Sequence, residues 1–97
     1  MELSNSINIL SALAHESRLV IFKQLVQAGP NGLQPKSLSN NLNMPAATLS
    51  FHLKELFHAN LVEKNKQGRF IYYSAQYQTM DDLIDYLKEN CCSGVPD

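Results

Sequence analysis

Three residues, Asn43-Met44-Pro45, separate two short segments whose apolar residues recur at helical spacing. The first segment runs from Pro35 to Leu42, and proline suits the first turn of a helix. The second segment runs from Ala46 to about His58. Its predicted inner face carries Leu49, Leu53, Leu56 and Phe57. Because so short a connector holds the two helices against each other, the pattern predicts a helix-turn-helix unit.

A polar segment between two strand-forming segments follows this unit. Leu61-Val62 and Phe70–Tyr73 are rich in β-branched and aromatic residues, and the basic segment Lys64–Arg69 lies between them. The arrangement predicts a β-hairpin with a basic tip.

The rest of the chain predicts three more helices. A first helix carries Leu3, Ile7, Leu10 and Leu13 at three- and four-residue spacing. A second spans about residues 16–28 and stops at Gly29-Pro30. The last is expected to begin at Thr79, where Asp82 completes a capping box, and to run into Cys91-Cys92. Its apolar stripe consists of Met80, Leu83, Ile84 and Leu87.

The predicted order of elements is α-α-α-α-β-β-α, a mainly α winged helix-turn-helix fold with a small β-hairpin. A chain of 97 residues supports one core. We therefore expect a single domain over residues 1–97, with residues 91–97 as a ligand-sensing tail. The first and last helices keep apolar stripes that a homodimer would cover. The predicted interface residues are Ile7, Leu10, Met80, Leu83, Ile84 and Leu87.

Composition excludes several classes of protein. No apolar run approaches the ~20 residues that span a bilayer, and the N-terminus lacks the basic region of a signal peptide, so we expect a cytoplasmic protein without a membrane partner. There is no C-x-x-C motif and no phosphate-binding glycine loop. His15, His52 and His58 have no nucleophile nearby in the sequence. We therefore do not expect an enzyme.

Charge is divided unevenly along the chain. Residues 36–69 contain five basic and two acidic side chains, a net charge of +3, although the whole chain has a net charge of −1. This segregation favours a polyanion such as double-stranded DNA on the face of the helix-turn-helix unit and the hairpin. The predicted DNA-binding residues are Lys36, Ala47, Thr48, Ser50, Phe51, His52, Lys54, Lys66, Gln67 and Arg69.

Three of these assignments have a structural alternative. Phe51 either covers a thymine methyl or a sugar, or turns sideways into the core. His52 falls near the leucine stripe and either contacts DNA or serves as a partly buried hydrogen-bonding residue. The hairpin tip either contacts phosphate or a minor groove, or is a solvated turn.

The segment TLSFHLKELFHANLVEKNKQGRFIYYSA resembles the ArsR (ArsR/SmtB) family of winged-helix repressors, whose pattern is S-x-H-L-x-x-L-x-x-A-G-L-V followed by G-R-x-x-x-Y. Asn60 replaces the usual glycine. The upstream ALAHESRLVIFKQL is also similar, with His15-Glu16 at the place of Asp-Pro or Ser-Pro. The resemblance implies a homodimer built on the first and last helices. It also implies a palindromic operator and release of DNA when an inducer binds.

Cys91 and Cys92 are the only cysteines of the chain. The cysteine box that some family members carry in the third helix is absent, and the last helix has no histidine for a nitrogen-rich zinc site. A subgroup of arsenic-responsive repressors has a similar E-N-C-C stretch with a third cysteine further on, which this chain lacks. Trivalent arsenic and antimony favour thiolates, so we expect As(III) or Sb(III), inorganic or organic, as inducer, and no permanently bound cofactor.

Adjacent side chains on a regular helix diverge by about 100°, so joint binding is expected to require unwinding of the helix at the two cysteines. A third ligand could come from the other subunit, a small thiol or hydroxide. The alternatives are a redox-sensing thiol pair, two thiols that only fill a helix end, a vicinal-thiol reductase, and a winged helix used only for protein interaction.

Overall fold

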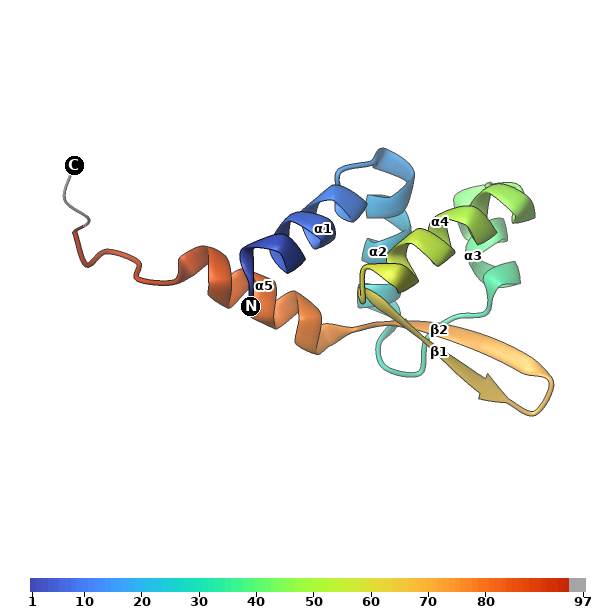
Figure 1. Ribbon diagram of the computed structural model, residues 1–97. Coiled ribbons are helices and arrows are strands. Elements are labelled where there is room, and N and C mark those ends of the chain that lie inside the picture. Colours follow the sequence, from blue (N-terminus) through green and yellow to red (C-terminus); the bar gives the residue numbers. More distant parts are fainter. Residues whose placement is uncertain (95–97) are drawn as a thin grey trace.

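The computed structural model describes residues 1–94 and confirms the predicted winged helix-turn-helix order of elements (Figure 1). The elements are α1 (Leu3–Leu13), α2 (Glu16–Ala28), α3 (Pro35–Leu42), α4 (Ala46–His58), β1 (Val62–Gln67), β2 (Phe70–Ala75) and α5 (Tyr77–Lys88). Pro35 lies in the first turn of α3, as predicted, and Asn43 ends that helix with a left-handed φ of 51°.

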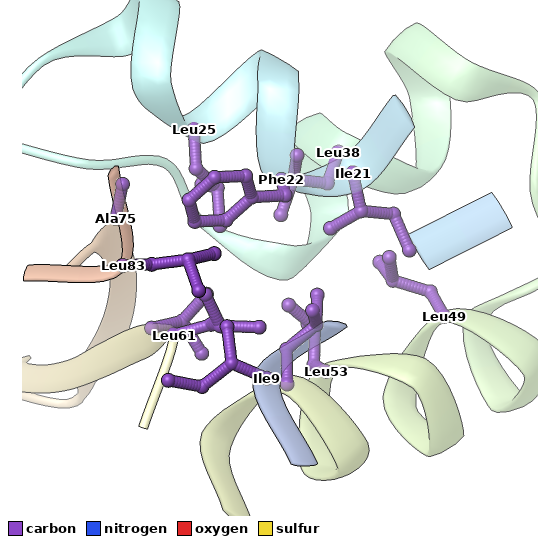
Figure 2. Close-up of a cluster of buried hydrophobic side chains, with 12 residues drawn as sticks. Ile9, Ile21, Phe22, Leu25, Leu38, Leu49, Leu53, Leu61, Ala75 and Leu83 are labelled. Atoms are coloured by element: carbon purple, nitrogen blue, oxygen red, sulfur yellow. The ribbon is translucent and has the colours of Figure 1, made fainter. Parts of the chain in front are cut away.

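A single core lies between α1, α2, α4 and the start of the hairpin (Figure 2). The side chains with no exposed surface include Ile21, Leu25, Leu38, Leu56 and Leu61. Leu83 is the buried apolar side chain that α5 adds to this core, and Figure 2 shows it near Ile9 and Leu61. The expectation that Phe57 faces the core is wrong, because this ring is 42 % exposed and lies under the ammonium of Lys64.

The hairpin forms the wing. β1 pairs antiparallel with β2 from Val62 opposite Ala75 to Gln67 opposite Phe70, so only Gly68 and Arg69 make the turn. The predicted basic tip is therefore largely strand, and the five residues of β1 after Val62 are all polar and exposed. Backbone pairing with β2 holds them in the strand.

A loop residue extends the sheet by one bridge. Leu33 exchanges two backbone hydrogen bonds with Tyr73, at 2.8 and 2.9 Å. Gly32, just before it, has a φ of 74°, and a Cβ there would clash with the carbonyl oxygen of Tyr73. Glycine is therefore required where the loop meets the wing.

Two polar contacts fix the junction between α1 and α2. The imidazole Nδ1 of His15 accepts a hydrogen bond from the backbone N–H of Ser17 and so caps α2. The Arg18 guanidinium donates to the carbonyl oxygen of Ala12 at 2.6 Å. These contacts give the His15-Glu16-Ser17-Arg18 segment a structural function.

The limits of α5 differ from the predicted ones. The helix begins at Tyr77, and Thr79 lies inside it with a buried hydroxyl that accepts from the amide of Asn60. The predicted capping box is therefore wrong. The helix ends at Lys88, before Cys91, and Asn90 then adopts a left-handed φ of 61°. The expectation that the helix runs into the cysteines is wrong, because asparagine readily takes a conformation that stops a helix.

The molecule is elongated. It measures 54 × 24 × 20 Å, and its radius of gyration is 15.2 Å, compared with about 13 Å for a compact chain of 100 residues. Figure 1 shows why: α5 (orange to red) runs away from the wing and past α1. Across residues 1–94, no helix has both the length and the apolar character needed to cross a membrane.

Candidate nucleic-acid interface and thiol site

The outer face of α4 is exposed and carries little charge in its first turns. Ala47, Thr48, Ser50, Phe51 and Lys54 are all exposed. Among the side chains of residues 1–94, none caps the N-terminus of α4, so its first backbone N–H groups remain available to a phosphate oxygen. Small hydrogen-bonding side chains and free amides together suit a helix that enters a major groove.

Phe51 projects from this face. The ring is 57 % exposed and stands edge-on to His52, with ring centroids 5.4 Å apart. The alternative that Phe51 turns into the core is therefore wrong for the unbound chain. An apolar ring of this size in solvent is suited to contact a thymine methyl or a deoxyribose.

His52 lies behind that face. It is 7 % exposed, its ring centroid is 4.8 Å from that of His15, and its Nδ1 has no hydrogen-bond partner within the described residues. Burial lowers the pKa of His52, and His15 and Arg18 lower it further. His52 is therefore placed as a buried neutral side chain that supports α4, which corrects its assignment as a residue facing DNA.

The other predicted DNA-binding residues lie in α3 and on the wing. Lys36 is exposed in the first turn of α3, and Lys66, Gln67 and Arg69 are exposed around the wing turn. A cavity of about 260 Å³ is lined by residues of α3, α4 and β2, among them Lys36, Ser50 and Tyr73. Exposed basic side chains thus lie in the first turn of α3 and around the wing turn, two positions suited to phosphate contacts.

Cys91 and Cys92 lie in an exposed turn after α5, and their sulfur atoms are paired as a vicinal disulfide. Cys92 has a left-handed φ of 70°, so the backbone here is not helical. The expectation that a helix must unwind before the two sulfur atoms converge is therefore wrong. The pair can offer two thiolates in its reduced form.

Two sulfur atoms fit a trivalent arsenic or antimony centre that keeps a third substituent from elsewhere. Within residues 1–94, no group of three or more His, Cys, Asp or Glu side chains could hold a metal ion. The acidic side chains of α5 and the turn after it are exposed: Asp81, Asp82, Asp85 and Glu89. One chain thus supplies a soft two-sulfur site.

An apolar surface runs along α1 and α5. On α1, Leu3, Ile7 and Leu10 are 64, 52 and 42 % exposed. On α5, Ile84 and Leu87 are 46 and 61 % exposed. Two of the predicted interface residues, Met80 and Leu83, are not part of this exposed surface.

Met80 is half-buried, and Leu83 is only 7 % exposed and belongs to the core. The assignment of Leu83 to an interface is therefore wrong, because its position in the second turn of α5 faces the chain's own α1.

Sequence reasoning did not identify the contact between Asn60 and Thr79. The amide nitrogen Nδ2 of Asn60 donates to Thr79 Oγ1 at 3.2 Å, which joins the end of α4 to α5. The replacement of glycine by Asn60 was the signal for this contact. A side chain at a position that glycine usually occupies indicates that the side chain makes a contact of its own.

Comparison with known proteins gives consistent results. A family model for a helix-turn-helix domain matches residues 13–65. The arsenical resistance operon repressor of Bacillus subtilis (strain 168) is 33 % identical over 81 residues, which cover 84 % of this chain and 73 % of the repressor.

Two further similarities differ in extent. An uncharacterized HTH-type transcriptional regulator of Methanocaldococcus jannaschii is 38 % identical over 86 residues, and the match spans only 22 % of that longer protein. The solved structure of an ArsR-like transcriptional regulator from Rhodococcus sp. RHA1 superposes with a TM-score of 0.81 at 27 % identity, covering 88 % of this chain and 77 % of that one.

Proposed function

This chain belongs to the ArsR family of winged-helix transcriptional regulators, and we propose that it is a repressor that releases its operator when trivalent arsenic or antimony binds Cys91 and Cys92. Its known relatives are DNA-binding regulators and not enzymes. A repressor of bacterial type would act in the cytoplasm, where the chromosome lies. The proposal has three parts, on DNA, on dimerisation and on the inducer.

The DNA-binding part rests on α4 and the wing. Ser50, Phe51 and Lys54 would contact base edges and sugars in the major groove, while Lys36 and Arg69 would contact phosphates. The exposure of all five side chains supports this assignment. Such contacts release counterions, so affinity should fall steeply as salt concentration rises.

The dimerisation part rests on the apolar surface of α1 and α5. Ile7, Leu10, Ile84 and Leu87 are each at least 42 % exposed, which is costly for a chain that stays alone in water. A second copy that buries them would place two α4 helices side by side. A two-fold dimer would then bind a palindromic operator with half-sites about one helical turn apart.

The inducer part rests on one observation: the two sulfur atoms converge in an exposed turn directly after the helix that bears half of the apolar surface. Trivalent arsenic and antimony bind such thiolate pairs more strongly than oxygen or nitrogen ligands. A bound centre would reshape the turn beside the dimer contact. The similarity to a named arsenical resistance repressor supports the choice of ligand.

An anisotropy titration tests the proposal. A labelled duplex, selected from random sequences by the wild-type chain, is bound and then titrated with arsenite, antimonite, methylarsenite, zinc chloride and hydrogen peroxide. Arsenicals or antimonite should weaken binding by about 5- to 150-fold. Cys91→Ser and Cys92→Ser should abolish this response, whereas Ser93→Ala should keep it. Release by zinc alone would reject the assignment.

The paired state of the sulfur atoms also favours a second candidate, a redox-responsive repressor. In that case hydrogen peroxide would take two electrons and two protons from the thiols and yield two waters and the disulfide. Release by peroxide and recovery with dithiothreitol, with no response to arsenite under reducing conditions, would select this candidate. Affinity that does not depend on salt would instead favour a winged helix used only for protein interaction.

A further inference from the structure

The cavity of about 260 Å³ lined by α3, α4 and β2 has a buried floor and an open rim. Leu49 and Leu53 line it and are only 1 and 2 % exposed. Lys36, Ala46 and Ser50 also line it, and these three residues are exposed. A molecule that enters from solvent would therefore meet polar groups first and apolar side chains beneath them.

The rim of the cavity is positively charged. Within residues 1–94, its lining contains Lys36 and no acidic side chain, and its hydroxyl groups belong to Ser39, Ser50 and Tyr73. Burial raises the pKa of the Tyr73 phenol, which therefore stays neutral at neutral pH. The surrounding segment, residues 36–69, contains five basic and two acidic side chains. The charge around the cavity thus favours a ligand with an anionic group.

The size and the floor of the cavity narrow the class of ligand. Drug-sized ligands occupy pockets of about 300–1,000 Å³, so this smaller cavity suits a molecule with a single ring. Its apolar floor favours a ring over a fully hydrated ion such as phosphate, because burial stabilises apolar surface and penalises an ion that loses its water. Lys36 can donate to a carboxylate in a charge-assisted hydrogen bond. The lining is therefore complementary to an aromatic carboxylate of the size of benzoate.

The cavity shares residues with the proposed DNA-binding surface. Lys36 and Ser50 line it, and the same two side chains are proposed to contact phosphate and base edges. A carboxylate bound to Lys36 would neutralise the charge that a DNA phosphate requires. Figure 1 shows α3, α4 and the wing at the opposite end of the molecule from the end of α5, so the cavity is separate from the turn with Cys91 and Cys92.

We propose that this cavity binds a small aromatic carboxylate, and that such a ligand competes with operator DNA for Lys36 and Ser50. The binding itself does not depend on the proposed function. The competition rests on the proposed operator binding by α4 and is independent of the two cysteines.

Backbone amide shifts in NMR spectra of the full, reduced chain test the site with three probes at constant ionic strength. The probes are benzoate, its neutral analogue benzamide, and inorganic phosphate, an anion without a ring. Benzoate should shift the amides of residues 36–39, 49–53 and 73. It should bind at least about tenfold more tightly than benzamide or phosphate, because only benzoate uses both the floor and Lys36.

The same titrations can reject the proposal. Equal affinities for benzoate and benzamide, or for benzoate and phosphate, would overturn the class of ligand. Shifts confined to α1 and α5 would show adventitious binding to the exposed apolar surface and would overturn the site.

Two substitutions with matched controls locate the binding. Lys36→Met removes the charge, keeps the apolar stem and should reduce the affinity for benzoate to that for benzamide; the control is Lys23→Met, at an exposed position on α2. Ala46→Phe adds a ring at the rim and should prevent binding of benzoate and benzamide; the control is Ala28→Phe, at the exposed end of α2. Circular dichroism verifies the fold of all four variants. A folded Ala46→Phe variant that binds benzoate as the wild type does would overturn the cavity as the site.

Anisotropy of the duplex selected by the wild-type chain tests the competition. Benzoate at ten times its dissociation constant should weaken duplex binding at least about tenfold, and sodium chloride at the same ionic strength should not. The effect should persist in Cys92→Ser. Duplex affinity that benzoate leaves unchanged would overturn the competition. If no duplex can be selected, operator binding is rejected, and the NMR titrations still decide whether the cavity binds the carboxylate.

Discussion

Two regions of this chain differ in how much of their apolar surface they bury. In the body, residues 3–75, α2, α3 and α4 enclose Leu25, Leu38 and Leu56 with no exposed area. In the C-terminal arm, residues 77–94, Leu83 reaches the core while Leu87 is 61 % exposed. The centre of the body thus buries its own leucines, whereas α5 leaves Ile84 and Leu87 exposed, as α1 leaves Leu3 and Ile7.

The two regions also differ in where their left-handed backbone conformations lie. In the body, left-handed residues sit at turns fixed by contacts, as Gly32 does against Tyr73. In the arm, Asn90, Cys92 and Gly94 are all left-handed within five residues, and all are exposed. Stability therefore resides in the body, and the part that can change shape at low cost is the turn that holds the two cysteines.

The largest contrast between the regions should appear in folding stability. Leu56→Ala removes a fully buried side chain and should lower the free energy of unfolding by about 3–5 kcal/mol. Leu87→Ala should change it by less than about 0.5 kcal/mol in dilute monomer, because the side chain is already in water. Urea denaturation at low protein concentration measures both. Equal losses would remove the distinction between body and arm.

A charged residue substituted into the C-terminal arm should weaken dimerisation and leave the body folded. Ile84→Glu places a carboxylate in the proposed interface, and we expect the dimer dissociation constant to rise at least about 100-fold. Sedimentation equilibrium measures this, and circular dichroism verifies the fold.

Ile71→Glu is the matched control for this substitution, because Ile71 lies on the wing and is 42 % exposed, close to the 46 % of Ile84. It should leave the dimer unchanged. If both variants are monomeric, or neither is, α5 does not form the interface.

The sequence predicted the body better than the arm, for a physical reason. Apolar spacing and the stop signal at Gly29-Pro30 located α2, α3 and α4 because local signals and core packing agree there. In the arm, Thr79 and Asp82 formed a plausible cap, but the hydroxyl of Thr79 bonds Asn60 instead. A tertiary contact overrode the local motif.

The residues of the candidate site also differ in how well the sequence predicted their positions. Exposure of Ser50, Phe51 and Lys54 followed from the helical period once the leucine stripe was located. The position of His52 did not, because it borders that stripe and packs against the ring of His15 from a separate segment of the chain. Convergence of Cys91 and Cys92 also could not be predicted, since it depends on where the helix stops.

Burial of His52 predicts a pH dependence of the body's stability. Its pKa is lowered in the folded chain, first by burial and then by His15 and Arg18, which outweigh the opposing effect of Glu55. The unfolded chain therefore takes up a proton below about pH 6.5 that the folded chain resists, so stability is full above that pH and falls with acidification. The slope cannot exceed about 1.4 kcal/mol per pH unit for one group.

Urea denaturation between pH 8 and pH 5 measures this slope. His52→Gln should flatten it, whatever its effect on absolute stability, and His58→Gln should not, because His58 is exposed. A slope that survives in His52→Gln would show that His52 does not cause it.

The smallest expected effect is that of a substitution on the wing. The wing folds as part of the body, and its basic side chains belong to the proposed DNA-binding surface. Arg69→Ala should weaken binding of the selected duplex by about three- to tenfold at 0.1 M salt and reduce the slope of log affinity against log salt by about 1, because one phosphate contact is lost. Lys23→Ala, an exposed substitution on α2, is the control and should change neither. Dimerisation and folding should be unaffected in both variants, since Arg69 lies exposed in the wing turn, with its guanidinium 6.0 Å from the ring centroid of its neighbour Phe70. An equal loss in both variants would mean that overall charge, and not the position of the wing, sets the affinity.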